Sequence, residues 1–222
     1  AETALGTLMQ AAAEAMTPPM GPVSVEIQID IHLAEIERPE ELDNLILPIP
    51  PAVAPAPRAI EALAKMVIEA RRPVLLSGNG AKHAGEAIGR LAKLGVAVVT
   101  SWNGRGVLPE DQPLVLGPLG STPEVERFYQ SIDLMLVAGS RLRGHETRDC
   151  TMRLPKRRAQ IDIDVRADGR TYSSDLFVHG DAALALCGLA DRLEGRWRAE
   201  PGFGDEVGRL KAEVVNNYRT AL

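Results

Sequence analysis

The chain has few aromatic residues, few cysteines and no long apolar run. Phe, Trp and Tyr make up only 4% of its 222 residues, which argues against a surface that stacks nucleic acid bases. Its 25 Lys and Arg are outnumbered by 30 Asp and Glu, so no basic surface for nucleic acid or anionic lipid is expected. No apolar stretch approaches the roughly 20 residues of a membrane-spanning helix.

Several sequence signatures are also missing. The two cysteines, Cys150 and Cys187, lie far apart and outside any metal-ligand spacing, which favours reduced thiols in a cytoplasmic protein. The first ten residues, AETALGTLMQ, lack the basic region of a secretory signal. The four histidines form neither HxxxH nor HExxH, and neither a GxSxG elbow nor a GxxxxGK[ST] phosphate loop occurs.

The first 57 residues predict a helix, a strand and a linker. Apolar residues between positions 2 and 16 have helical spacing, and Val23, Val25, Ile27 and Ile29 alternate with polar residues as in a strand. One helix and one strand cannot bury a core by themselves, so residues 1–32 need a neighbour. Residues 33–57 contain six prolines, which predicts a stiff linker and a domain boundary.

Residues 58–195 alternate apolar strands with amphipathic helices. Strands are expected at 73–77, 96–100, 133–138, 160–163 and 176–178, with helices at 58–71, 84–91, 122–130 and 181–193. Gly95 is placed to end a helix, while Thr122 and Asp181 are placed to cap one. Buried parallel strands between helices predict a doubly wound, Rossmann-like α/β domain. A further amphipathic helix is expected within residues 196–222.

Ligands of such sheets bind at the carboxyl ends of the strands, where four segments could contribute. Gly78–Gly80 could admit a phosphate or could be a plain tight turn. Residues 100–106 could line a ligand, or Trp102 within them could simply cover the core or an interface. In residues 139–148 the arginines could bind a phosphate or carboxylate. An acid–base role for His145 and Glu146 is disfavoured, because a lone histidine beside charges on a loop is usually solvated. Residues 160–164 could bind a ribose through an acid, or could cap a helix or pair with Arg166 or Arg170.

The order of these segments resembles the thiamine diphosphate-dependent decarboxylase and acetolactate synthase superfamily. The resemblance runs through GPVSVEIQID, PVLLSGNGAKHAGEAI, VAVVTSWNGRGVLPEDQPLVLGPLGSTP, DLMLVAGSRL and QIDIDVRADGRTYSSDLFVHGD. Its most specific part is GRGVLPEDQPLVLGPLG at 104–120, which follows the family pattern GKGxxPExHPxxxGxxG.

The resemblance implies a particular place for each segment. Residues 1–32 would be the end of a pyrimidine-binding domain, 33–57 a linker, 58–195 the central domain, and 196–222 a connector toward a pyrophosphate-binding domain. The parent enzyme would act on 2-keto acids with thiamine diphosphate and Mg²⁺, as a homodimer or homotetramer. The family's activating glutamate and its GDG…N magnesium motif would lie outside this chain, so we expect no catalytic residue here and an inactive fragment.

In some relatives the central domain binds flavin adenine dinucleotide (FAD) or ADP. The positions that would line such a site are Gly78, Asn79, Gly80, Thr100, Ser101, Gly117, Leu119, Gly120, Gly139, Arg141, Asp162, Ile163, Gly180 and Asp181. The chain departs from the flavin-binding pattern, because Arg141–Glu146 replaces an RFDDR-like run. This departure favours a central domain that is only a scaffold. A stand-alone nucleotide-binding module and a structural assembly module are the alternatives.

Overall fold

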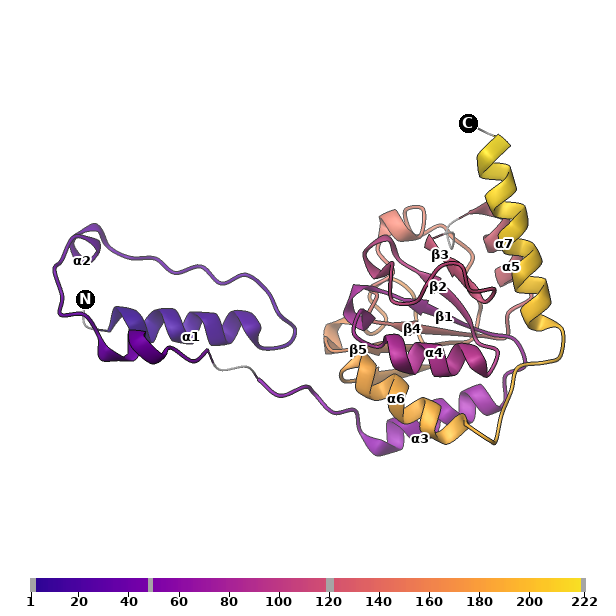
Figure 1. The fold of residues 1–222 in the computed structure, drawn as a ribbon, viewed down its shortest axis with the longest axis horizontal. Coiled ribbons are helices and arrows are strands. Elements are labelled where there is room, and N and C mark those ends of the chain that lie inside the picture. The colour runs from indigo at the N-terminus through magenta and orange to yellow at the C-terminus, as the bar shows by residue number, and fades with distance from the viewer. Residues whose placement is uncertain (1–2, 48–49, 119–121, 221–222) are drawn as a thin grey trace. The chain divides into compact units, whose positions relative to one another are not determined.

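The computed structural model describes residues 3–47, 50–118 and 122–220 (Figure 1). The chain divides into two compact units, Ala1–Val53 and Ala54–Leu222. Among the described residues, no helix is both long enough and apolar enough to cross a membrane.

The first unit contains helices and extended chain. Helix α1 spans Ala4–Met16, as the spacing predicts, followed by α2 at Ile29–His32 and the 3₁₀ turn η1 at Glu40–Asn44. The strand expected at residues 23–29 is wrong, because residues 20–28 form no regular structure and α2 begins at Ile29. A strand needs a neighbouring strand to accept its backbone hydrogen bonds, and none forms among the described residues of this unit.

The second unit is built on a six-stranded parallel sheet with the order β3-β2-β1-β4-β5-β6. The strands are β1 Pro73–Ser77, β2 Ala97–Thr100, β3 Val115–Gly117, β4 Leu134–Ala138, β5 Arg158–Asp162 and β6 Leu176–His179. This order confirms the doubly wound α/β class. The order reverses between β1 and β4, which places the switch point of the sheet there.

Five of the six strands follow the sequence prediction closely. β5 begins two residues earlier than expected. β3 was missed because it is only three residues long and its register against β2 shifts between Val98 and Val99. So short a strand at the edge of a sheet leaves too little periodicity to recognise.

Helices cover both faces of the sheet (Figure 1). One layer holds α3 at Pro57–Ile68, α4 at Gly85–Lys93 and α6 at Ala182–Leu193, whose apolar residues share one core cluster. The other holds α5 at Pro123–Tyr129 and α7 at Phe203–Thr220, whose apolar residues share a second cluster. The predicted caps are confirmed, since the Thr122 side chain accepts a hydrogen bond from Val125 N and the Asp181 side chain accepts one from Leu184 N.

Helix α7 is anchored to the sheet by its buried face. Phe203, Val207 and Val214 are almost fully buried, and the Phe203 ring stacks on Phe128 with 5.9 Å between centroids. Arg72 lies over the Phe203 ring and pairs with Glu200 and Glu206 at the start of the helix. The part of the expected connector between Phe203 and Val214 therefore packs against the sheet of the second unit.

Candidate functional site

The carboxyl edge of the sheet collects most of the predicted site residues. Loops after β1, β2 and β4 meet there because the strands are parallel and adjacent. Leu119 and Gly120 lie outside the described residues.

Glycines at the switch point let two loops of the chain touch each other. A Cβ on Gly78 would collide with the Gly139 carbonyl and would lie 2.6 Å from Ser140 Cβ. A Cβ on Gly80 would lie 2.9 Å from Gly139 Cα. The loops are also hydrogen-bonded, from Gly78 N to Ala138 O at 2.8 Å and from Gly80 N to Gly139 O at 3.0 Å. These contacts account for the glycines as packing residues without a ligand.

The loop after β2 locks against the loop after β1 in the same way. Ser101 N donates to Ser77 O at 3.0 Å, and a Cβ on Gly104 would lie 3.0 Å from Gly78 C. Ser101 Oγ accepts a hydrogen bond from Gly104 N at 3.1 Å. The three loops therefore form one interlocked edge.

No helix begins directly after Gly78–Gly80. Asn79–Ala81 forms a 3₁₀ turn, and α4 starts only at Gly85 with Ala84 at its N-cap and no side-chain cap. A dinucleotide phosphate is normally held where a helix N-terminus follows the glycine turn immediately. That arrangement is absent from this described stretch.

The acidic end of β5 is engaged by neighbouring groups. Asp162 Oδ1 accepts a hydrogen bond from Asp164 N at 2.9 Å. Asp164, whose side chain is only 3% exposed, pairs with Arg141 at 3.2 Å and with Arg166 at 2.8 Å. Residues 160–164 were expected either to bind a ribose or to form a helix cap or salt bridge. Asp164 forms the cap and the salt bridge, since its side chain also accepts a hydrogen bond from Arg166 N.

The pKa values of these two carboxyl groups are shifted in opposite directions. Burial raises the pKa of the Asp162 carboxyl above its ordinary value. The hydrogen bond from the Arg166 guanidinium holds the pKa of Asp164 below its ordinary value. Burial destabilises the charged form of a carboxyl group, whereas a cationic donor stabilises it.

The remaining predicted residues beyond β5 and β6 also have partners within the chain. The Ile163 carbonyl lies 3.0 Å from His179 Nε2, and Gly180 N donates to Asp162 O at 3.0 Å. A Cβ on Gly180 would lie 2.9 Å from Pro55. The Asp181 carboxylate is used as the cap of α6.

A small cavity opens beside this edge, next to the loop that carries Trp102. Its volume is about 20 Å³. It is lined by Leu76, Thr100, Ser101, Trp102, Pro118, Tyr129, Glu146, Thr147, Met152 and Leu154. Sequence reasoning missed Tyr129, because its position on the apolar face of a short helix marks it only as a core residue.

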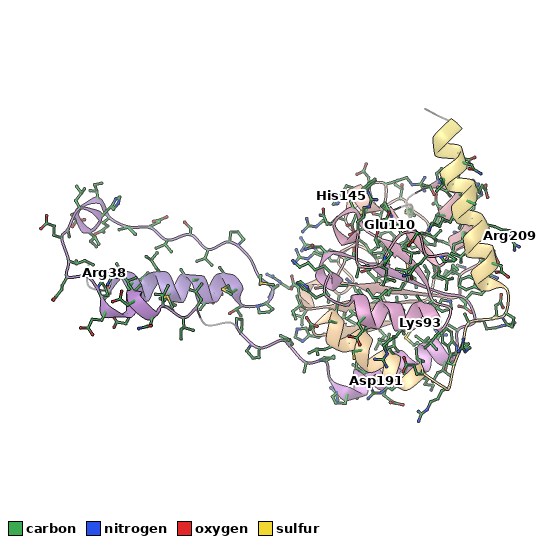
Figure 2. The ribbon with its side chains drawn as sticks, viewed as in Figure 1. Arg38, Lys93, Glu110, His145, Asp191 and Arg209 are labelled. Atoms are coloured by element: carbon green, nitrogen blue, oxygen red, sulfur yellow. The ribbon has the colours of Figure 1, made fainter. Side chains whose placement is uncertain are left out.

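His145 and Glu146 behave differently from each other. The His145 side chain is 59% exposed and lies at the rim of the domain in Figure 2. Glu146 is 14% exposed, borders the cavity and accepts a hydrogen bond from Ser140 Oγ at 2.9 Å. The nearest His145–Glu146 ion-pair distance is 3.9 Å, too long for a hydrogen bond.

The described residues contain no group of three or more His, Cys, Asp or Glu side chains that could hold a metal ion.

Comparison with known proteins agrees with this geometry. Residues 60–189 match the family model described as thiamine pyrophosphate enzyme, central domain. A probable 2-ketoarginine decarboxylase of Pseudomonas aeruginosa is 31% identical over 195 residues, covering 87% of this chain and 34% of that protein. Acetolactate synthase 1 of Zea mays, a chloroplastic protein, is 30% identical over 213 residues, covering 90% of this chain and 33% of that protein.

A solved structure shows the same fold. The benzoylformate decarboxylase of Polynucleobacter necessarius superposes with a TM-score of 0.72 at 22% identity, covering 90% of this chain and 37% of that one. The chain thus spans about a third of the length of the curated relatives it matches. The match over residues 60–189, together with the six-stranded parallel sheet, shows that the chain belongs to the thiamine pyrophosphate enzyme family and contains the central domain of these enzymes.

Proposed function

We propose that this chain is the central part of an enzyme that acts on 2-keto acids with thiamine diphosphate and Mg²⁺. The observation that carries the proposal is the family match over residues 60–189, which coincides with the six-stranded sheet and its helices. The relatives named above as a 2-ketoarginine decarboxylase and an acetolactate synthase support a decarboxylase or a carboligase.

The domain's own contribution in this proposal is structural. The loops at the carboxyl edge of its sheet contact one another at Gly78, Gly104 and Gly139, and α7 is buried against the same sheet. A rigid central body of this kind would hold the cofactor-binding parts of the enzyme at fixed positions. Residues 1–32 would belong to the pyrimidine-binding domain and the region after 195 would lead toward the pyrophosphate-binding domain.

Exposed apolar side chains in the first unit support its proposed assignment to another domain. Met20 and Ile29 are each at least 70% exposed, and none of the residues of α1 is buried. Exposed apolar surface of this extent marks a contact region. In the proposed enzyme this surface packs against the rest of the pyrimidine-binding domain within a homodimer or homotetramer.

The proposed scaffold role excludes a dinucleotide at the switch point. Several of the described residues that would line an FAD or ADP site are hydrogen-bonded within the chain, and the glycine loops occupy each other's space. Arg141 and Asp162 are engaged through Asp164. A stand-alone nucleotide-binding module would instead need these groups free.

The test uses the full-length protein that carries this segment. Carbon dioxide release from pyruvate, benzoylformate and 2-ketoarginine is measured with and without thiamine diphosphate and Mg²⁺. Turnover that depends on both additions is expected with at least one of these acids. Calorimetric titration showing no binding of thiamine diphosphate would overturn the proposed function. Titration with FAD and with ADP is expected to show no binding, and micromolar binding of either would establish the nucleotide-binding alternative.

A further inference from the structure

The cavity beside Trp102 is lined by a residue whose buried hydroxyl group has no hydrogen-bond partner among the described residues. Tyr129 is 1% exposed, lines the cavity, and its hydroxyl oxygen has no hydrogen-bond partner among the described residues. Burial raises the pKa of this hydroxyl, so the group stays protonated and keeps its donor. Leaving a buried hydroxyl without a hydrogen-bond partner is unfavourable, so a partner bound beside Tyr129 stabilises the folded protein.

Two other polar groups in the cavity wall retain hydrogen-bonding capacity. Ser101 Oγ accepts from Gly104 N, which leaves its own proton to donate. The Glu146 carboxylate accepts from Ser140 Oγ through Oε2, while Oε1 lies 3.9 Å from the nearest histidine nitrogen. A carboxylate has about four acceptor positions, so Glu146 can accept from a bound molecule.

The hydroxyls of Ser77 and Thr100 also lack partners among the described residues. The two residues are register partners on β1 and β2, but of the two only Thr100 lines the cavity. Its hydroxyl can donate one hydrogen bond and accept others, so Thr100 adds a further polar group to the cavity wall.

The size and chemistry of the cavity restrict what can bind there. A volume of about 20 Å³ holds one water-sized group, because one such group needs roughly 10–15 Å³ on the same measure. Tyr129 and Glu146 line the same cavity, and one group that accepts a hydrogen bond from Tyr129 and donates one to Glu146 would satisfy both side chains. An ammonium ion only donates, and a carbonyl oxygen only accepts. A hydroxyl oxygen does both.

We propose that this cavity is a binding site for one hydroxyl oxygen, which bridges the Tyr129 hydroxyl and the Glu146 carboxylate with Ser101 as a third partner. Water and a small alcohol share this chemistry. An alcohol would place its alkyl group against the apolar part of the wall, which Leu76, Met152 and Leu154 provide.

The sign of one mutational effect tests the proposal. Tyr129→Phe removes the hydroxyl and keeps the ring. If a bound oxygen satisfies Tyr129, urea unfolding of the variant should give an unfolding constant raised about 2- to 10-fold. The matched control is Tyr172→Phe, which removes a hydroxyl that donates to Met152 O at 3.1 Å and should give a rise of the same order. If the hydroxyl is unsatisfied, Tyr129→Phe leaves stability unchanged or raises it, and the proposal is overturned.

A crystal structure of the full-length protein and a titration identify the source of the oxygen. Density within hydrogen-bonding distance of both Tyr129 and Glu146 is expected, whereas a protein atom in that place or an empty cavity would refute the site. Trp102 lines the cavity, so its fluorescence reports binding. A saturable change with methanol or ethanol, lost in Tyr129→Phe, identifies an alcohol site. A change that does not saturate rules out an alcohol site, and the density is then assigned to water. Ammonium chloride serves as the negative control.

Discussion

Replacing Gly78 with alanine should destabilise the second unit without any ligand being present. The added Cβ would lie 2.6 Å from Ser140 Cβ and 2.7 Å from Gly139 C, and it would collide with the Gly139 carbonyl. The φ of Gly78 is −93°, which any residue can adopt, so the effect comes from space alone. The neighbouring atoms are mostly backbone and cannot rotate away.

The magnitude follows from two contributions. Overpacking of a closely packed site costs about 1–3 kcal/mol. Separating the two loops also strains the hydrogen bonds from Gly78 N to Ala138 O and from Gly80 N to Gly139 O, each worth about 1 kcal/mol net. We therefore expect Gly78→Ala to lower the free energy of unfolding by about 3–5 kcal/mol.

The assay is urea unfolding followed by far-UV circular dichroism, with Gly208→Ala as the matched control. A Cβ on Gly208 meets no atom within 4 Å, and the residue lies inside α7, so alanine should stabilise by about 0.5–1 kcal/mol. If Gly78 instead makes room for a ligand, Gly78→Ala would match wild-type stability and lose only ligand binding. That result would refute the packing argument.

Three further predictions concern charged residues. Arg72→Met should lower the free energy of unfolding by about 2–3 kcal/mol, because the guanidinium is 20% exposed and pairs with Glu200 and Glu206 at 2.7 Å; urea unfolding with no change would contradict this. Asp133→Ala should cost about 1–2 kcal/mol, since the carboxylate accepts from Arg71 N and Arg72 N at 2.7 and 3.0 Å, and thermal unfolding of Asp133→Asn, which keeps one acceptor, should show a smaller loss. Burial raises the pKa of Asp162 above 3.8, so the wild-type protein loses stability as pH rises through the folded pKa and the carboxyl group becomes charged. Asp162→Asn carries no such charge, so its free energy of unfolding relative to wild type should increase over that pH range. A difference independent of pH would contradict the last prediction.

Strands and helices of the second unit were predictable because their signals are local. Leu75 and Leu136 sit in unbroken apolar runs bounded by turn residues, which read as buried parallel strands. Thr122 and Asp181 accept hydrogen bonds from the first turns of α5 and α6, as residues of their type do at helix starts. The family resemblance of residues 104–120 was likewise carried by a short pattern.

The strand predicted at residues 23–29 does not form, and it illustrates what a local sequence pattern cannot predict. Alternation of Val23, Val25 and Ile27 with polar residues describes which faces a strand would present, not whether a partner strand exists. In this unit the described residues provide none, so the segment stays extended and α2 forms at Ile29–His32. The pattern alone cannot supply the hydrogen-bonding neighbour.

By itself, the sequence determined the doubly wound class, the order of most elements and the family. These depend on periodicity, caps and motifs, which are properties of neighbouring residues. Only the tertiary structure decided that Gly78, Gly80 and Gly139 contact one another, and that Tyr129 and Glu146 share one cavity. A glycine in a turn leaves space that either a bound phosphate or a second loop can fill. Which of the two fills it depends on residues distant in the sequence, so the sequence of the turn alone does not decide.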